Sequence, residues 1–462
     1  MSHHSQAISL PKPRQRAFAT LLALIVILMA SGVVAGLQTW SYAQASEGRE
    51  ALARARAYWA ARAGVESTIA RIENETENPT TDDAFAIMDS MIQVAEGKTR
   101  GATWTIETTE RGQRVLGPAD AHAKLNINTL TAEQMLTLDP IMAEDVADSV
   151  LDWIDSDDDT NPLGAEVGYY QSLPQKIMPR NAPMRSIAEL ELVAGVIQED
   201  VRGEDWNLNG ILDANEDDGD ESWPPDNADG VLDAGWSGVL TAASVGDVLA
   251  ASGEERLDLS SAQAGDLVSR TGVASDQADA IVAYAQSGQA TSIADFILFD
   301  LAQLEDIANG AIRAGTRVIR PQGFQRSRVE SLSEEQLGAL LNEASMTAPS
   351  STGASVPGAL NLNTCAAETL QYLPQLSPEI ADAIIAERSS RPQGFTSVAD
   401  LLSVEGISRT QLASLYSLFT TRSNVYIVTS RGRDELTGLE VEIVATLDRS
   451  TLPVVLREVM VR

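Results

Sequence analysis

The sequence is poor in the residues on which many enzymes depend. Its 462 residues include one cysteine, Cys365, so no disulfide can form within the chain. Of three histidines, only His122 lies beyond the first four residues. A Ser-His-Asp triad would have one candidate base, and the chain has no nucleophile-elbow motif, Walker loop or Cys-His zinc spacing. These absences predict a protein that is not an enzyme.

Positive charge is also scarce. The 33 Lys and Arg residues are outnumbered by 66 Asp and Glu residues, which gives a net charge of −33. A surface this negative repels phosphate groups and anionic membranes, and it favours cations and basic partners. The composition therefore argues against nucleic acid as a partner.

Internal repeats bear on the same question. The segment "LNINTLTAEQMLTL" from Leu125 returns as "LNLNTCAAETLQYL" from Leu360, and a weaker third copy starts at Leu257. Each predicts a short strand, a cap and a small amphipathic helix, as in helix-hairpin-helix modules. Modules that bind DNA use Gly-rich turns flanked by Lys or Arg. The turns here carry acids and hardly any base, so we expect the repeats to be scaffold and to bind no nucleic acid.

The N-terminal region contains the one long apolar run. Phe18 to Leu37 is a stretch of twenty uncharged residues, long enough to cross a membrane as a helix. Lys12, Arg14 and Arg16 precede it and acids follow it, which predicts a cytoplasmic N-terminus. We expect a single span over about residues 18–40, within one helix that continues to about residue 75. Most of the chain would then lie outside the cytoplasm.

A basic leader, the small residue Ala17 and then Phe18 at the start of an apolar helix resemble a type IV prepilin. This resemblance implies that prepilin peptidase removes residues 1–17 by cutting the Ala17–Phe18 bond, and that the new amine is methylated. Most members have Gly before the cut and Glu at the fifth mature position, where this chain has Ala17 and Leu22. The K-type minor pseudopilins of type II secretion typically lack that glutamate.

The remainder of the chain is similar to the general secretion pathway protein K family. The matching features are "AARAGVE" at 60–66, the Asp-Trp-Ile-Asp run at 152–155 and the Tyr169-Tyr170 pair. The resemblance implies a minor pseudopilin of the inner membrane, with most of the chain in the periplasm. It would initiate and cap the pseudopilus tip for protein export across the outer membrane. Its partners would be the I- and J-type minor pseudopilins, with the H-type as a further partner.

These features predict an α+β fold with a pilin-like N-terminal helix over 18–75. The head would combine residues 76–124 and 420–462 in an antiparallel sheet, including a hairpin at 101–115. Residues 125–410 would form a mostly α-helical inserted domain with helix-hairpin-helix or SAM-like repeats. One apolar face of the long helix is expected to dock other minor subunits, and its residues are Leu52, Trp59, Val65, Ile69 and Ile72.

An acidic segment within the insertion predicts a calcium site. Residues 205–216, "DWNLNGILDANE", fit the loop pattern D-x-[DN]-x-[DN]-G-x5-E without a mismatch. Gly210 would allow the sharp turn of the loop. The expected donors are the side chains of Asp205, Asn207, Asn209, Asp213 and Glu216 and the backbone carbonyl of Ile211. The alternative is a solvated acidic linker, because residues 204–233 hold eleven acids and no Lys or Arg.

Two further loops match this pattern less well. The segment "DSDDDTNPLGAE" predicts calcium ligands at Asp155, Asp157, Asp159 and Glu166, but it lacks the glycine. The segment "PDNADGVLDAGW", at 225–236, has the central residues but Pro and Trp at its ends, so it is interpreted as a degenerate partner loop. Calcium is thus the expected cofactor. A membrane-anchored calcium-dependent extracytoplasmic adhesin or binding module is the alternative function.

Overall fold

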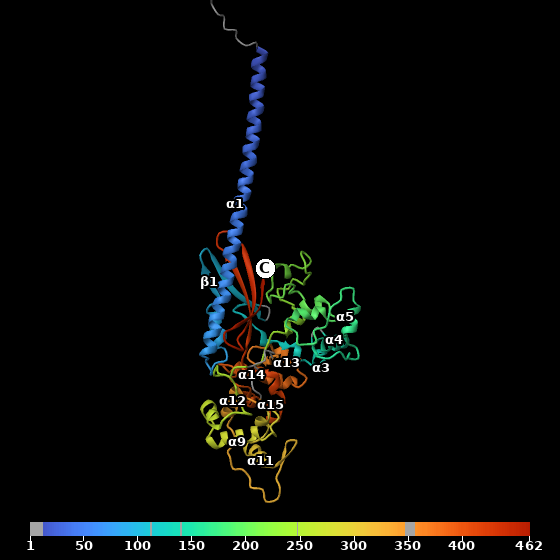
Figure 1. The fold of residues 1–462 in the computed structure, drawn as a ribbon, viewed down its shortest axis with the longest axis vertical. Helices are drawn as coiled ribbons and strands as arrows, with labels where there is room; N and C mark the ends of the chain where they lie inside the picture. Colours follow the sequence, from blue (N-terminus) through green and yellow to red (C-terminus); the bar gives the residue numbers. More distant parts are fainter. Residues whose placement is uncertain (1–12, 111–112, 139–140, 247, 347–355) are drawn as a thin grey trace, which may run out of the picture.

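The computed structural model describes residues 13–110, 113–138, 141–246, 248–346 and 356–462. Most of the predicted leader therefore lies outside the described residues. Helix α1 (Pro13–Glu77) is 65 residues long, and its first half extends away from the rest of the molecule (Figure 1). The helix is long and apolar enough near its start to cross a membrane once.

The second half of α1 packs against an antiparallel sheet. Its strand order is β1-β2-β13-β14-β15, with β3 paired to β2 and β4 paired to β13. The strands are β1 (Glu96–Thr99), β2 (Ala102–Glu110), β3 (Gln113–Leu116), β4 (Ala119–Asp120), β13 (Val425–Asp434), β14 (Glu440–Asp448) and β15 (Val455–Val461). Helix α2 (Ala86–Ile92) connects α1 to the sheet. The sheet confirms the predicted pilin-like α+β class, including the hairpin at 101–115 and the three C-terminal strands.

Small residues bring α1 very close to β13. A Cβ atom added to Gly432 would lie 1.9 Å from the carbonyl oxygen of Ala57, and one added to Gly64 would lie 2.5 Å from Oγ of Ser430. The Ser430 hydroxyl donates a hydrogen bond of 2.9 Å to the carbonyl oxygen of Ala61. Part of the segment that resembles the family signature therefore forms the contact between the helix and the sheet.

This packing corrects the prediction for the apolar face of α1. Val65 and Ile72 are fully buried, and Ile69 packs against the same core of the head. They contact the protein's own sheet and are not a surface for other subunits. Only Leu52 and Trp59, which are 50% and 64% exposed, remain for such contacts. Periodicity identified the apolar residues but not the surface that covers them.

The inserted region consists of three modules, and each begins and ends with a two-residue strand. The two strands of a module pair in parallel, so its entry and exit lie side by side. The pairs are β5 (Leu125–Asn126) with β6 (Leu240–Thr241), β7 (Leu257–Asp258) with β10 (Ala344–Ser345), and β11 (Leu360–Asn361) with β12 (Phe419–Thr420). The weaker third copy predicted from Leu257 is therefore a module of the same kind.

Short helices fill each module around one large shared core. The first module contains α3 (Ala132–Met135), α4 (Glu144–Ile154), α5 (Val167–Ser172), α6 (Gln198–Arg202) and α7 (Gly235–Val239). The second contains α8 (Ala264–Thr271), α9 (Ser275–Gln286), α10 (Asp295–Leu298), α11 (Leu301–Ala308), α12 (Glu334–Glu343) and the hairpin β8 (Ile312–Ala314) and β9 (Arg317–Ile319). The third contains α13 (Ala367–Gln371), α14 (Pro378–Ser390) and α15 (Arg409–Leu415).

The first and third modules each contain an asparagine whose side chain bonds to the backbone of a distant residue in the same module. The side chain of Asn128 accepts from Met184 N at 2.7 Å and donates to Met184 O at 3.1 Å. Asn363 does the same to Phe395, at 2.7 and 2.9 Å. Ser260 occupies this place in the second module and bonds to its neighbour Asp258 instead. The second module therefore lacks the asparagine that the other two modules share, and its sequence matches theirs less well.

Candidate functional site

The loop at 205–216 is folded by its own predicted calcium ligands. The carboxylate of Asp205 accepts hydrogen bonds from the backbone N–H groups of Asn209 and Gly210, at 2.9 and 3.0 Å. The side-chain oxygen of Asn209 accepts from Ile211 N at 2.7 Å. Gly210 has φ +70, a left-handed conformation that glycine adopts without strain. The backbone therefore turns sharply at the position where the calcium pattern requires glycine.

Glu216 closes this loop with a buried carboxylate. It is 1% exposed, and its two oxygens accept from the backbone N–H groups of Trp206 and Asp213, both at 3.1 Å. Burial is the main reason why the pKa of Glu216 is raised to about 7, and the nearby carboxylates of Asp205 and Asp213 contribute to this shift. Burial also raises the pKa of Asp205. The loop thus encloses negative charge that a cation would stabilise.

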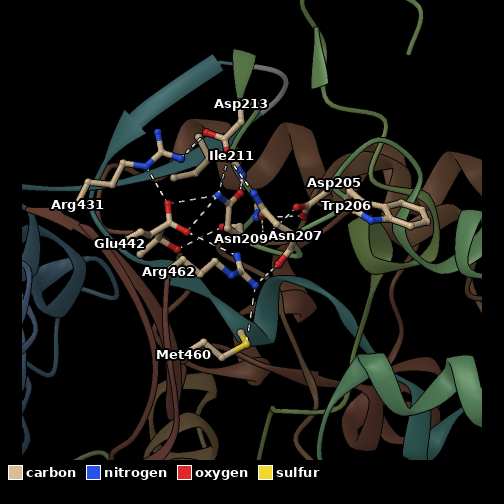
Figure 2. Close-up of polar contacts among 12 residues, drawn as sticks. Asp205, Trp206, Asn207, Asn209, Ile211, Asp213, Arg431, Glu442, Met460 and Arg462 are labelled. Carbon is tan, nitrogen blue, oxygen red and sulfur yellow. Dashed lines mark hydrogen bonds and ion pairs between the residues drawn. The ribbon is translucent and has the colours of Figure 1, made fainter. Parts of the chain in front are cut away.

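The same loop contacts the sheet of the head. Figure 2 shows Asp213 pointing to Arg431, which also bonds to Glu442 at 2.8 Å. Burial acts to raise the pKa of Asp213, but the Arg431 guanidinium and the hydrogen bonds from Asn207 and Asn209 together outweigh it, so the pKa is lowered. Backbone bonds add to this contact, since Thr109 N donates to Gly210 O at 3.1 Å. The candidate site therefore lies at the junction between the insertion and the head.

The second acidic loop, at 225–236, has the same backbone form as the first. Gly230 has φ +77 and Ala228 has φ +52, matching +70 at Gly210 and +54 at Leu208. The side-chain oxygen of Asn227 accepts from Asp229 N at 2.9 Å, which repeats the bond from Asn209 N to Asn207. The degenerate loop is therefore a structural copy of the first.

Pro225 and Trp236 stand at the first and last positions of the second loop, where they supply no carboxylate. Two acidic residues that flank the first loop bond to the second loop instead. Asp217 accepts from Gly230 N at 2.9 Å, as Asp205 does from Gly210 N. Glu204 accepts from Asn227 N and Asp233 N, at 3.1 and 3.2 Å, in the manner of Glu216. The sequence did not indicate these roles, because both residues lie outside the loop that they complete.

A separate carboxylate cluster lies between α4 and α5. Oxygens of Asp152, Asp155 and Glu166 all lie within 4.8 Å of one another. One oxygen of each is buried and has no hydrogen-bond partner among the described residues. The other predicted ligands, Asp157 and Asp159, are exposed and do not belong to this group. The structure thus brings Asp155 and Glu166 together and adds Asp152, which the loop pattern did not include.

Burial sets the electrostatics of this cluster. It raises the pKa of Asp155 and of Glu166, and the neighbouring carboxylates add to both shifts. Gly164 is required for the close packing here, because a Cβ atom at this position would lie 2.1 Å from Oδ2 of Asp152. Three convergent carboxylates that have no cationic partner among the described residues are a donor set that suits a hard cation such as calcium.

The processing residues lie at the start of α1. Ala17 and Phe18 are both within the helix, and Phe18 is exposed. The apolar side chains that follow, including Leu22, are also exposed in the part of α1 that extends from the body. An exposed apolar helix of this length is suited to lipid.

Comparisons with known proteins agree with the resemblance seen in the residues. The family model described as Type II secretion system (T2SS), protein K, matches residues 117–203, which include the Asp152 cluster. A helix-hairpin-helix motif model matches residues 358–420, the third module. None of the curated proteins compared with the chain matches its sequence. The protein K match confirms the resemblance to that family.

Among solved structures, one similar chain comes from the crystal structure of the GspK-GspI-GspJ complex from the enterotoxigenic Escherichia coli Type 2 Secretion System. The similarity covers 90% of this chain and 99% of that chain, at 11% identity and a TM-score of 0.45.

Proposed function

We propose, from the protein K domain of the type II secretion system that this chain carries, that it is a minor pseudopilin that initiates the periplasmic pseudopilus and occupies its tip. It would be held in the inner membrane by α1, with the N-terminus in the cytoplasm and the modules in the periplasm. Its contribution would be assembly and not catalysis.

The position of the insertion is the observation that carries the tip assignment. The modules lie beside the sheet and beyond it, at the end away from the free half of α1 (Figure 1). In a filament built by stacking such helices, the head of the next subunit toward the tip would occupy this space. A subunit with the insertion therefore fits where no subunit follows it.

Leu22 supports the same position. A glutamate at this place in a pilin helix would be buried in lipid, where an unpaired carboxylate is costly. The resemblance implies that this glutamate pairs with the amine of a neighbouring subunit. A subunit that receives no such neighbour has no use for the charge, and this chain has leucine.

Counting subunits tests the tip assignment. We expect about one copy of this chain in each sheared pseudopilus, measured by quantitative mass spectrometry against the major subunit. Many copies distributed along the shaft would contradict the proposal.

The mature N-terminus separates this function from the adhesin alternative. A pseudopilin should lose residues 1–17 and carry a methylated amine on Phe18, and intact-mass measurement of the membrane-extracted protein would detect both changes. An anchored calcium-dependent adhesin would retain the leader. Blocking the cut with Ala17→Glu should keep the precursor intact and abolish secretion.

We also propose that the two carboxylate sites hold calcium. In the loop at 205–216 the donors would be Asp205, Asn207, Asn209, Ile211, Asp213 and Glu216. In the cluster they would be Asp152, Asp155 and Glu166. When bound, calcium would supply positive charge to the buried carboxylate of Glu216 and to those of the cluster. At the first site it would also hold the insertion against the head, because Asp213 contacts Arg431.

A further inference from the structure

The second module contains a basic segment that contrasts with the rest of the chain. Residues 307–329 include five arginines and no acid, whereas the whole chain has a net charge of −33. The arginines are Arg313, Arg317, Arg320, Arg326 and Arg328. The segment includes the hairpin of β8 and β9. It lies close to α11, at the end of the molecule farthest from the free half of α1 (Figure 1).

Two of these arginines fix the hairpin to the module. Arg313 bonds to the buried carboxylate of Asp295 at 2.8 Å and lies 4.9 Å from the ring centre of Phe299. Arg320 bonds to the buried Asp306 at 2.5 Å. Asp306 also accepts from the backbone N–H of Ser327 at 2.7 Å, which ties down the returning chain. Charge-assisted hydrogen bonds on its inner side therefore fix the segment to the rest of the module.

The outer face of the hairpin has no such contacts. Ile312 and Ile319 are directly paired across the two strands and are 60% and 54% exposed. Arg317, Arg326 and Arg328 are exposed, and no described acidic side chain lies within ion-pair distance of them. Arg317 belongs to β9, whereas Arg326 and Arg328 belong to the chain that follows the hairpin. The basic segment thus exposes an apolar pair together with three guanidinium groups.

We propose that the exposed side chains of this basic segment, Ile312, Ile319, Arg317, Arg326 and Arg328, form a docking surface for the acidic face of a folded protein partner. An apolar centre together with arginine is the composition found in the energetically important parts of protein interfaces. Guanidinium groups recognise carboxylates with directed hydrogen bonds. The surface goes beyond the proposed function and does not depend on the position of the chain in the filament.

The charge distribution argues against other anionic partners. Binding to anionic lipid by charge uses clusters of about four to eight Lys or Arg residues, and three are unpaired here. A nucleic acid would place many phosphates near a chain of net charge −33, which repels them. A protein partner needs carboxylates only around the isoleucine pair, so it fits the small basic area.

The test uses the full-length protein in detergent micelles and a labelled peptide of alternating Glu and Val, read by fluorescence anisotropy. The variant Arg317→Gln/Arg326→Gln/Arg328→Gln should bind the peptide at least tenfold more weakly than the wild type. The control Arg185→Gln/Arg409→Gln/Arg433→Gln changes the net charge equally and should stay within twofold. Ile312→Ser/Ile319→Ser should weaken binding without changing its salt dependence.

Folding should be unaffected in the first variant, because Arg313 and Arg320 are retained, and matching thermal unfolding midpoints would verify this. A lysine–valine peptide can bind to acidic surfaces elsewhere on the chain, and the first variant should not weaken that binding. The proposal is overturned if the wild type does not bind the acidic peptide, if both arginine variants bind it alike, or if vesicles of phosphatidylglycerol or duplex DNA bind this face more tightly than the peptide does.

Discussion

At the residue scale, the energetics of the candidate metal sites depend on several buried carboxylates that have no ion-pair partner among the described residues. Glu216 illustrates the balance, because its two oxygens accept only backbone hydrogen bonds while burial raises its pKa. Asp152 is also a buried carboxylate, and one of its oxygens has no hydrogen-bond partner among the described residues. In both cases the electrostatic cost of burying a negative charge should fall when the charge is removed, and also when a cation binds.

The first prediction concerns Glu216 and pH in metal-free protein. Its folded pKa of about 7 exceeds the ordinary 4.5, so the folded state binds the proton more tightly. This stabilisation is complete below about pH 4.5 and is lost as the pH rises through about 7, which amounts to about 3 kcal/mol. Glu216→Gln should lack this loss. It should therefore be more stable than the wild type at pH 8 in EDTA, as measured by urea unfolding.

Calcium should make the wild type more stable than Glu216→Gln. Saturating calcium should raise the free energy of unfolding of the wild type by about 4 kcal/mol at a thousandfold excess over Kd. The Gln variant should gain little, because the bidentate ligand is gone. Parallel pH curves for the two proteins, or an equal gain with calcium, would remove Glu216 from the site.

The second prediction concerns the ligands of the other cluster. Asp152→Asn should remove about one bound calcium per chain, measured by isothermal titration, because Asp152 contributes one of three convergent oxygens. Asp157→Asn, two residues after Asp155 and on the exposed part of the loop, is the matched control and should keep full stoichiometry. If Asp157→Asn alone abolished binding, the ligands would be those of the loop pattern and not those of the cluster.

At the element scale, the sequence predicted the helices and strands better than it predicted their partners. Alternation in β13 and β14 and the apolar run of α1 are local signals, and the structure has these elements. The core that buries Val65 and Ile72 includes Ile106 and also residues of β13 and β14 more than 300 positions later, so periodicity alone could not identify it. For the same reason the pattern at 205–216 was found, whereas the roles of Glu204 and Asp217 required the structure.

The third prediction tests the contact between α1 and β13. Gly432→Ala should lower the free energy of unfolding by about 1 to 3 kcal/mol, because its Cβ would meet the carbonyl oxygen of Ala57 at 1.9 Å. Gly48→Ala is the control, since no atom lies within 4 Å of its added Cβ within an exposed helix. It should leave the protein unchanged or stabilise it by up to about 1 kcal/mol. Similar effects of both substitutions on urea unfolding would contradict the close contact.

At the scale of the whole molecule, α1 divides into a half that lies free and a half that packs against the head. Assembly with other subunits must use what the head leaves uncovered. Leu52 and Trp59 are exposed at the junction of the two halves, and a large aromatic side chain is a frequent source of binding energy in interfaces. The head and the helix are thus arranged for contacts along α1.

The fourth prediction follows from this arrangement. Trp59→Asp should weaken the proposed complex with I- and J-type minor pseudopilins by about 2 kcal/mol or more, roughly thirtyfold, and should reduce secretion. Leu436→Asp, at an exposed turn of the head, is the control and should preserve both. Co-purification of the subunits and secretion assays would measure the effects. Equal losses in the two variants would place the interface elsewhere.

The paired two-residue strands that open and close each module have a consequence for how such a chain can grow. Because β7 and β10 lie side by side, the whole stretch between them forms a closed loop whose ends meet. A coding segment for such a loop can be duplicated or deleted within a gene, and the flanking polypeptide still joins across the same short gap. A complete unit can therefore be added or removed while the register of the neighbouring units stays unchanged.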